Sequence, residues 1–252
     1  MCLIISGKNL NQWGITPPFR TENISKDSEI IRETSYDIEK LNAYINTNKL
    51  FLIDDQKKAF QTIMKNIIEE KEGLFFLDAP GGTGKTFLLN LILAEVRKSG
   101  NIALAVASSG VAATLLHGGR TAHSALKLPI NFNLTEEPIC NIIDNPATCK
   151  LLKQTNVIIW DECTMANKKG PEALDKTLQD LKKNNFIMGK VIVILAGDFR
   201  QTLPIISRGT PADQIHACLK NSYLWKHVKI ITLKNNMRVF LTGDTNLENF
   251  SR

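Results

Sequence analysis

The sequence predicts an α/β fold built on a mainly parallel sheet that is covered by helices on both faces. Short apolar runs recur along the chain, amphipathic helical stretches separate them, and a glycine-rich turn joins one run to a helix. The runs are nearly apolar throughout, as expected for parallel strands that are buried on both faces. Right-handed crossovers would bring the carboxyl ends of these strands to one edge, where we expect ligands to bind.

The composition is that of a globular chain with a basic charge balance. The 252 residues are enough for one large or two small domains, and 43% are hydrophobic. The net charge of +6 fits a polyanionic partner such as nucleic acid, although no dense tract of lysine and arginine is present. No apolar run approaches the roughly 20 residues that span a bilayer, so we expect no membrane span. None of the five cysteines forms a CxxC pair, so neither a zinc site nor a disulfide framework is indicated.

Residues 1–49 are expected to be an N-terminal segment or linker. They show little periodicity up to about residue 35, where a linker or a short helix is expected. Ile38, Leu41 and Ile45 then recur at helical spacing, which predicts a helix over residues 36–47.

A stronger amphipathic helix is predicted from residue 55 to about residue 70, with Asp54 as its cap. Its predicted apolar stripe consists of Phe60, Ile63, Met64, Ile67 and Ile68. Gln56 lies in the first turn, shortly before the glycine-rich turn. An amide there can donate and accept hydrogen bonds at once, which suits the edge of an adenine base. The alternative is an exposed polar residue of a first helical turn.

Residues 74–90 predict a phosphate cradle. An apolar strand leads into a turn with three glycines, and Lys85-Thr86 then opens a helix. Glycines let backbone N–H groups face an anion, and the helix N-terminus adds partial positive charge. Lys85 can reach the β- and γ-phosphates of a nucleotide, and the Thr86 hydroxyl can bind magnesium. The predicted nucleotide-binding residues are Gln56, Ala79, Pro80, Gly81, Gly82, Thr83, Gly84, Lys85 and Thr86. The alternative is a glycine-rich turn that only joins a core strand to a core helix.

A second apolar strand is predicted over residues 101–107, and small residues follow it. Serines, glycines and threonines at the end of a parallel strand suit contacts to a phosphodiester backbone. The candidate residues for this contact are Ser109, Gly110, Thr121, His123 and Ser124. His123 has no second histidine or cysteine at metal-binding spacing.

A third strand, over residues 156–162, ends in two carboxylates. Asp161 would hold Mg²⁺, directly or through water, and Glu162 would orient and polarise the attacking water. The alternative, a solvated strand end, is disfavoured by the phosphate cradle earlier in the chain. The stretch before this strand, residues 129–150, is interrupted by three prolines and is expected to be an insertion or a long loop.

The last predicted elements are an amphipathic helix over residues 171–181, a fourth strand over 191–196 and a fifth over 228–233. Gln201 follows the fourth strand, where its amide could sense the γ-phosphate. Arg238 follows the fifth strand as a candidate charge clamp on the same phosphate.

Five motifs together carry a resemblance to a known family. They are APGGTGKT (79–86), ASSGVAATLLHGGRTAHS (107–124), VIIWDECTM (157–165), GDFRQTLPI (197–205) and LKNNMRV (233–239). This set resembles superfamily 1 DNA helicases of the petite-integration-frequency type, and it looks closest to the divergent copies found in eukaryotic genomes, including those of Helitron transposons. The resemblance covers about residues 50–240.

The resemblance implies a RecA-like P-loop NTPase domain over residues 50–240, followed by a C-terminal tail over 241–252. It implies ATP and Mg²⁺ as cofactors, 5′-to-3′ translocation, and single-stranded and forked duplex DNA as partners. It implies roles in repair, recombination and telomere maintenance, and placement in the nucleus with the mitochondrion as the alternative. By the family's motifs, the catalytic residues are Lys85, Asp161, Glu162, Gln201 and Arg238, the metal ligands are Thr86 and Asp161, and the strand-contacting residues include Thr121, His123 and Ser124.

Two departures from the family's pattern stand out. Many members have an aromatic residue where this chain has Ala125, which removes a stacking group from that position. The family's helicases also carry a second motor domain, which this sequence lacks, so we expect a fragment that needs that domain for full activity. The alternatives are a catalytically weak half-motor that binds nucleotide or DNA, and another P-loop NTPase such as a kinase or a clamp-loader-like ATPase.

Overall fold

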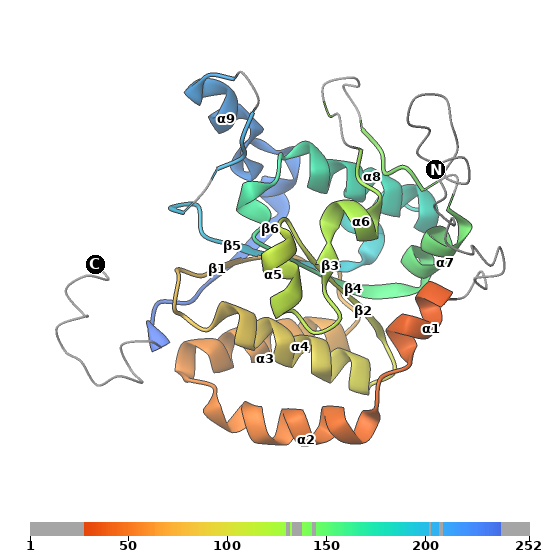
Figure 1. Cartoon of the computed structure of the whole chain (residues 1–252), viewed down its shortest axis with the longest axis vertical. Coiled ribbons are helices and arrows are strands. Elements are labelled where there is room, and N and C mark those ends of the chain that lie inside the picture. Colours follow the sequence, from red (N-terminus) through yellow and green to blue (C-terminus); the bar gives the residue numbers. More distant parts are fainter. Residues whose placement is uncertain are drawn as a thin grey trace, which may run out of the picture.

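A six-stranded parallel sheet organises the chain in the computed structural model, which describes residues 28–129, 132, 138–142, 145–201, 203–206 and 209–237 (Figure 1). The strands are β1 (Leu74–Asp78), β2 (Ile102–Ala107), β3 (Arg120–Thr121), β4 (Thr155–Asp161), β5 (Ile192–Gly197) and β6 (Val228–Thr232). Their order across the sheet is β3-β2-β4-β5-β1-β6, and every neighbouring pair is parallel. The expected α/β fold and its five predicted strands are therefore confirmed.

Nine α-helices occur among the described residues. They are α1 (Ser28–Thr34), α2 (Ile38–Asn48), α3 (Asp54–Ile68), α4 (Lys85–Lys98), α5 (Gly110–Leu115), α6 (Ala122–Leu126), α7 (Pro146–Gln154), α8 (Lys169–Lys182) and α9 (Pro211–Ala217). Short 3₁₀ segments occupy Lys49–Phe51, Cys163–Met165, Ile187–Lys190, Leu219–Asn221 and Tyr223–His227. Helices α3 and α4 cover one face of the sheet with α2 outside them, and α7 and α8 lie on the other side (Figure 1).

Consecutive residues of the central strands fill two different cores. Phe75 and Ile159 pack with α2, α3 and α4, whereas their chain neighbours Phe76 and Trp160 pack with α6, α7 and α8. Successive side chains of a strand point to opposite faces, so a strand with apolar residues at every position must be covered on both sides. Continuous apolar runs therefore predicted these strands correctly.

The predicted helices near the N-terminus are present, but one residue of each predicted apolar face is exposed to solvent. In α2, Ile45 is buried, whereas Ile38 is 56% exposed. In α3 most of the predicted stripe is buried or half-buried, but Ile68 at the helix end is 75% exposed. Asp54 is the first residue of α3 rather than its cap, since Ile53 occupies the cap position.

Residues 28–49 pack against the rest of the domain. Ile45 lies in the same core as the residues of α4, and Glu33 of α1 is buried. No helix of the described part of the chain is long and apolar enough to cross a membrane.

The prediction of a loop or insertion over residues 129–150 is wrong at its end, where a helix begins. Helix α7 starts at Pro146 and is capped by Asn145, whose side chain accepts a hydrogen bond from Thr148 N. Proline favours the first turn of a helix, so this proline begins an element instead of interrupting a loop. Strand β3 and helix α9 were not predicted either, because two and seven residues give too short a pattern to recognise.

Candidate phosphate-binding site and the residues around it

The glycine-rich turn between β1 and α4 is a preformed loop. Ala79 N donates to Gly197 O at 3.2 Å, and the Thr83 hydroxyl donates to Pro80 O at 2.8 Å. Gly82 and Gly84 have φ of +87° and +76°, in the left-handed region that glycine adopts without steric cost. The loop therefore leads its backbone to the N-terminus of α4, the expected position of the phosphates.

Lys85 forms an ion cluster with the two carboxylates that follow β4. Its Nζ lies 2.8 Å from Asp161 Oδ1 and also contacts Glu162 Oε1. The side chains of Lys85, Asp161 and Glu162 are 12%, 2% and 23% exposed, respectively. Burial by itself lowers the pKa of the Lys85 ammonium, but the neighbouring carboxylates outweigh it and the pKa is raised. The structure thus brings together the predicted phosphate, metal and water positions.

Glu162 is held by its backbone as well as by Lys85. Its φ is +51°, which is uncommon for a residue with a side chain, and its N–H donates to Asp161 Oδ1 at 2.8 Å. Non-glycine residues in this conformation occur at functional turns. The turn points the Glu162 carboxylate back at Lys85.

The oxygen donors near Lys85 suit a magnesium ion bound through a nucleotide. Thr86 lies in the first turn of α4, directly after Lys85, and supplies a hydroxyl, and Asp161 supplies a carboxylate. Among the described residues no group of three or more His, Cys, Asp or Glu side chains gathers. Mg²⁺ commonly takes only one or two protein ligands, with phosphate and water oxygens completing its shell. The donor set therefore fits Mg²⁺ held together with phosphates.

Gln56 contacts the phosphate loop directly. It is buried in the first turn of α3, where its Nε2 donates to Thr83 O at 2.8 Å and its Oε1 accepts from Ile53 N at 3.3 Å. A carboxamide has a second hydrogen and a second lone pair, so one donor and one acceptor remain for a base. Gln56 is thus placed beside the loop, and its predicted contact with adenine stays a prediction.

Sequence reasoning missed Asp55, which ties the end of the domain to the start of α3. Its Oδ2 accepts hydrogen bonds from Lys234 N at 2.9 Å and Asn235 N at 3.2 Å. These contacts join a side chain to backbone groups far along the chain, so no local sequence pattern predicts them. The segment after β6 is held against α3 by this one carboxylate.

The segment after β6 runs along the phosphate loop. Leu233 N donates to Asp78 O at 2.9 Å, and Met237 N donates to Gly82 O at 2.8 Å. A β-carbon on Gly82 would lie 2.6 Å from Asn236 Oδ1, so only glycine fits here. Arg238, the predicted charge clamp, is the next residue and lies outside the described residues.

The segment after β5 brings Gln201 to the loop. A β-carbon on Gly81 would lie 3.3 Å from Gln201 Nε2. The Asp198 carboxylate accepts from Arg200 N and Arg200 Nε, both at 3.0 Å. Burial alone raises the pKa of Asp198, but these hydrogen bonds outweigh it and the pKa is lowered. Gln201 therefore lies at the side of the loop where the γ-phosphate is expected.

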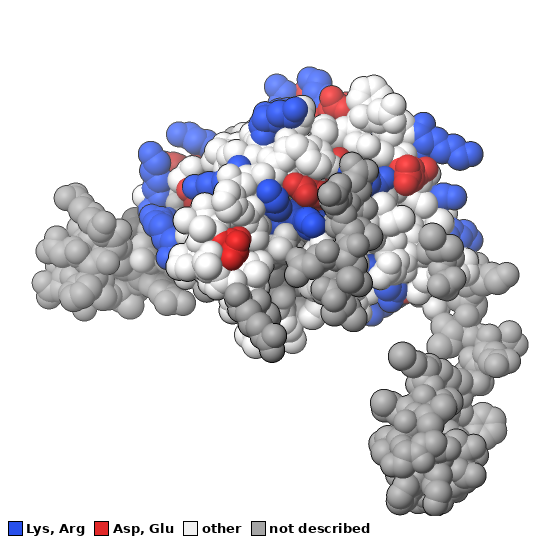
Figure 2. Space-filling model, turned by 90° about the horizontal axis from the view of Figure 1, so that it is seen from above, with Lys and Arg blue, Asp and Glu red and all other residues white. Residues whose placement is uncertain are grey.

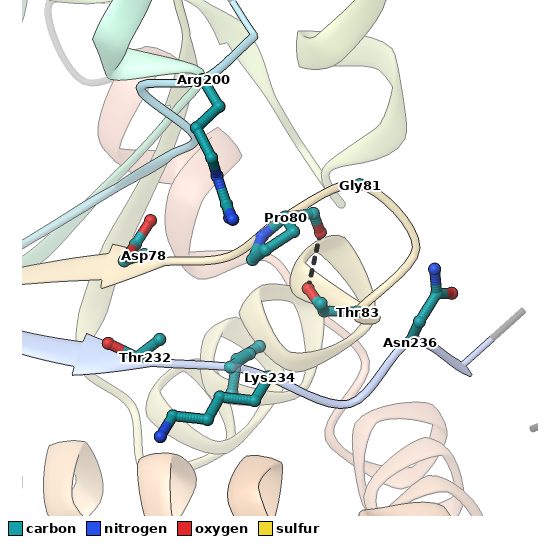
Figure 3. A pocket seen from close by; sticks show the side chains of 9 residues that line it. Asp78, Pro80, Gly81, Thr83, Arg200, Thr232, Lys234 and Asn236 are labelled. Carbon is teal, nitrogen blue, oxygen red and sulfur yellow. Dashed lines mark hydrogen bonds between the residues drawn. The ribbon is translucent and has the colours of Figure 1, made fainter. Parts of the chain in front are cut away.

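A pocket of about 460 Å³ opens beside the loop (Figure 3). Arg200 reaches toward the loop from the segment after β5 and Asp78 lies at the end of β1, whereas Lys234 lines the pocket from the segment after β6 with its side chain directed away from the loop. The lining residues are Asp78, Pro80, Gly81, Thr83, Arg200, Thr232, Leu233, Lys234 and Asn236. The pocket therefore places Arg200, which is ion-paired with Asp198, beside the phosphate loop.

The predicted strand-contacting residues gather at the ends of the neighbouring strands β2 and β3. Ser109 caps α5 by accepting from Ala112 N at 3.1 Å, and Gly110 is the first residue of that helix. Thr121 caps α6 by accepting from Ser124 N at 3.4 Å. His123 and Ser124 are exposed.

Two observations connect this group to its surroundings. Ala125, which takes the place of the aromatic residue expected from the family resemblance, is buried, and the His123 ring lies 6.4 Å from that of Phe132. Ser108, next to Ser109, donates its N–H to Asp161 O at 3.1 Å and accepts from Trp160 Nε1 at 2.9 Å. Ser108, the neighbour of the predicted strand-contacting group, is therefore hydrogen-bonded to the strand that leads to the two predicted catalytic carboxylates.

Comparison with known proteins gives a family match. The family model described as PIF1-like helicase matches residues 51–252. An ATP-dependent DNA helicase Pif1 from Psychrobacter is 31% identical over 163 residues, which are 65% of this chain and 25% of the relative. An ATP-dependent DNA helicase PIF1 from Candida albicans is 28% identical over 201 residues, which are 77% of this chain and 21% of the relative. The chain thus spans about a fifth to a quarter of these relatives.

Solved structures share the fold. The crystal structure of Pif1 helicase from Candida albicans superposes with a TM-score of 0.64 at 25% identity, over 79% of this chain and 42% of that one. A Bacteroides Pif1 helicase solved with ADP-AlF3 and single-stranded DNA gives a TM-score of 0.59 at 24% identity, over 77% of this chain and 46% of that one.

Proposed function

The chain belongs to the PIF1-like helicase family, and from this premise we propose that residues 50–240 are the first motor domain of an ATP-dependent DNA helicase that moves 5′ to 3′ on single-stranded DNA. The observation that carries the proposal is the contact of Lys85 with Asp161 and Glu162 at the phosphate loop. A lysine, a metal-binding carboxylate and a water-orienting carboxylate at one loop are the groups that hydrolysis of a nucleotide requires.

Each residue of the cluster has a distinct role in the proposed reaction. When ATP binds, the ammonium of Lys85 would give up its contact with a carboxylate and contact the β- and γ-phosphates instead. Thr86 and Asp161 would hold Mg²⁺, which would supply charge neutralisation at the phosphates. Glu162 orients the attacking water and accepts its proton.

The remaining predicted residues would surround the γ-phosphate. Gln201 would contact it from the segment after β5, and Arg238, which lies outside the described residues, keeps its predicted role as a charge clamp. Gln56 keeps one donor and one acceptor for the base. The loop residues Ala79, Pro80, Gly81, Gly82, Thr83 and Gly84 supply the backbone that surrounds the phosphates.

Single-stranded and forked duplex DNA are the proposed nucleic-acid partners. The proposed contact surface consists of Ser109, Gly110, Thr121, His123 and Ser124. The net charge of +6 favours a polyanion, and lysine and arginine side chains are more prominent than carboxylates on the face that Figure 2 presents. Because the ends of β2 and β4 are hydrogen-bonded neighbours, strand contact and hydrolysis would occur at one edge of the sheet.

The proposal is tested by ATP hydrolysis with and without single-stranded DNA. We expect the wild-type chain to hydrolyse ATP, with stimulation by DNA, and Glu162→Gln to lose turnover while it still binds nucleotide. Lys85→Ala should weaken nucleotide binding as well. Failure of the wild-type chain to bind ATP-Mg²⁺, together with no effect of Lys85→Ala, would refute the assignment.

A second candidate function is a half-motor that binds nucleotide and DNA with negligible turnover. It would use the phosphate loop before α4 and the predicted strand-contacting residues that follow β2 and β3. Nucleotide binding without turnover, at every protein concentration and with DNA present, would support it. Brisk DNA-stimulated turnover by the chain alone would exclude it.

The proposed compartment follows from the family only. We place the protein in the nucleus, with the mitochondrion as the alternative, and imaging of a tagged protein in its own cells tests this placement.

A further inference from the structure

A buried ion cluster joins α1 to the turn that precedes Thr121. Glu33 is 2% exposed, and its carboxylate lies 3.6 Å from Arg97 Nη2 and 3.3 Å from Arg120 Nη2. Arg120 directly precedes Thr121 in β3, and Glu29, one helical turn before Glu33, lies 4.0 Å from the same guanidinium. Helix α1 therefore holds the residue next to the proposed DNA contacts.

Helix α4 holds the other end of the same turn. Arg97 donates from Nη1 to His117 O at 2.6 Å and from Nη2 to Ala103 O at 2.9 Å. Asn90 donates to Leu115 O at 2.9 Å and accepts from His117 N at 2.8 Å. Three backbone groups of residues 115–117 are thus bonded to side chains of α4, the helix that begins at Lys85.

The glycine between these two anchors has almost no free space. Gly118 has φ of +71°, and a β-carbon on it would lie 2.5 Å from the Tyr36 hydroxyl and 3.3 Å from Arg97 Nη2. The Tyr36 hydroxyl in turn donates to Glu33 at 3.4 Å, and its ring lies 4.3 Å from the Arg97 guanidinium. The backbone at Gly118 therefore packs directly against the ion cluster.

We propose that Glu33 is a positioning residue for the DNA-contacting turn, which we define as residues 117–124. It acts through Arg97 and Arg120 and does not itself touch DNA. The proposal rests on the proposed function, since that assigns Thr121, His123 and Ser124 to DNA.

Two considerations favour a positioning role over a purely stabilising one. Buried ion pairs add little net stability compared with apolar residues of the same shape, because desolvation offsets their attraction, whereas in some proteins they specify one geometry. Glu33 also precedes residue 51, where the family match begins, so the family's own motifs do not assign it a role.

The direction in which Glu33→Gln changes DNA affinity distinguishes a positioning role from the effect of losing one negative charge. Glu33→Gln removes one negative charge, which by itself strengthens binding of a polyanion. If Glu33 positions the turn, the variant instead binds oligo-dT more weakly, by about 2- to 30-fold in Kd. Glu39→Gln, an exposed site in the first turn of α2, removes the same charge and should bind DNA as well as wild type or slightly better.

Two further readouts separate positioning from loss of folding. Nucleotide affinity of Glu33→Gln should stay within about 2-fold of wild type, since the loop at residues 79–84 is untouched. Hydrogen exchange should accelerate at Gly119 N, which bonds Leu116 O, and at Ser124 N, while amides of β1 and β5 stay protected. Gly118→Ala, whose β-carbon would meet Tyr36 and Arg97, should likewise weaken DNA binding and accelerate exchange in the turn.

The outcomes are distinct. Unchanged or tighter oligo-dT binding by Glu33→Gln, or unchanged exchange over residues 117–124, overturns the positioning role while the proposed function stands. If Glu33→Gln does not fold, Glu29→Gln, which removes the other α1 carboxylate that contacts Arg120, decides the question by the same two criteria. If the wild-type chain binds no single-stranded DNA at all, the proposed function falls and the positioning role falls with it.

Discussion

Replacing Lys85 by methionine in the nucleotide-free chain is expected to destabilise the fold markedly. The substitution keeps the length of the side chain but removes the cation between Asp161 and Glu162. Removing one partner of a buried ion pair costs about 3–5 kcal/mol, and the partial exposure of Glu162 favours the lower end, about 3 kcal/mol. For a chain of this size the midpoint of thermal unfolding should then fall by about 6–12 °C.

The measurement is thermal unfolding at pH 7 without nucleotide, followed by circular dichroism. Lys71→Met is the matched control, because Lys71 forms an exposed pair with Glu69 at 2.7 Å, and exposed pairs contribute little. The double variant Lys85→Met/Asp161→Asn should recover part of the loss, since one unpaired carboxylate is gone. A midpoint shift no larger than that of Lys71→Met would refute the reasoning.

The pH dependence has a definite sign. The pKa of Lys85 is raised in the folded chain above its ordinary value of 10.5, so its contribution to stability is complete below about pH 10.5 and is lost as the pH rises through the folded value. The stability difference between wild type and Lys85→Met should therefore be constant near neutrality and shrink in strong alkali.

Three other substitutions or modifications test the site and the core. Gln56→Ala leaves a buried loop carbonyl without its donor and should cost about 1–3 kcal/mol of unfolding free energy, measured by urea titration, with weaker nucleotide binding. Gly82→Ala should weaken nucleotide binding, because its β-carbon would lie 2.6 Å from Asn236. Gly100→Ala is the control: it has the same backbone strain, at φ +76°, but no atom lies within 4 Å, so it should bind nucleotide normally. Burial raises the pKa of the Cys140 thiol to about 11, so iodoacetamide at pH 8 should modify it only after denaturation, and rapid native labelling, read by mass spectrometry, would contradict that.

The sheet was predictable because its interior strands carry their own signal. Residues such as Phe75 and Phe76 are apolar on both faces, and only a strand with helices on both sides can bury both. Strand β3 carries no such signal, because two residues are too few to form a pattern. Ile68 fits the helical period, yet it lies in the last turn of α3 where no neighbouring element covers it.

Motifs in the sequence predict the chemical residues of the candidate site, but they do not predict the contacts that hold these residues in place. Lys85 and Asp161 are recognisable because each follows a strand in a fixed local pattern. Asp55 bonds the backbone of residues 234 and 235, and Arg200 and Asn236 line one pocket beside the phosphate loop, although these residues lie far apart in the sequence. Their positions depend on the order of the strands in the sheet, which local sequence patterns do not predict.

The position of β1 within the sheet has a consequence for how the domain assembles. Its only partners in the described sheet are β5 and β6, which lie roughly 120 and 150 residues further along the chain. Pairings of such long sequence separation form late and slowly, because loop-closure entropy must be overcome first. During synthesis, β2 and β4 can pair before β1 has a neighbour, and β1 has both of its neighbours only once about 230 residues have left the ribosome. Strand β1, although encoded in the first third of the chain, is among the last strands of the sheet to gain its neighbours.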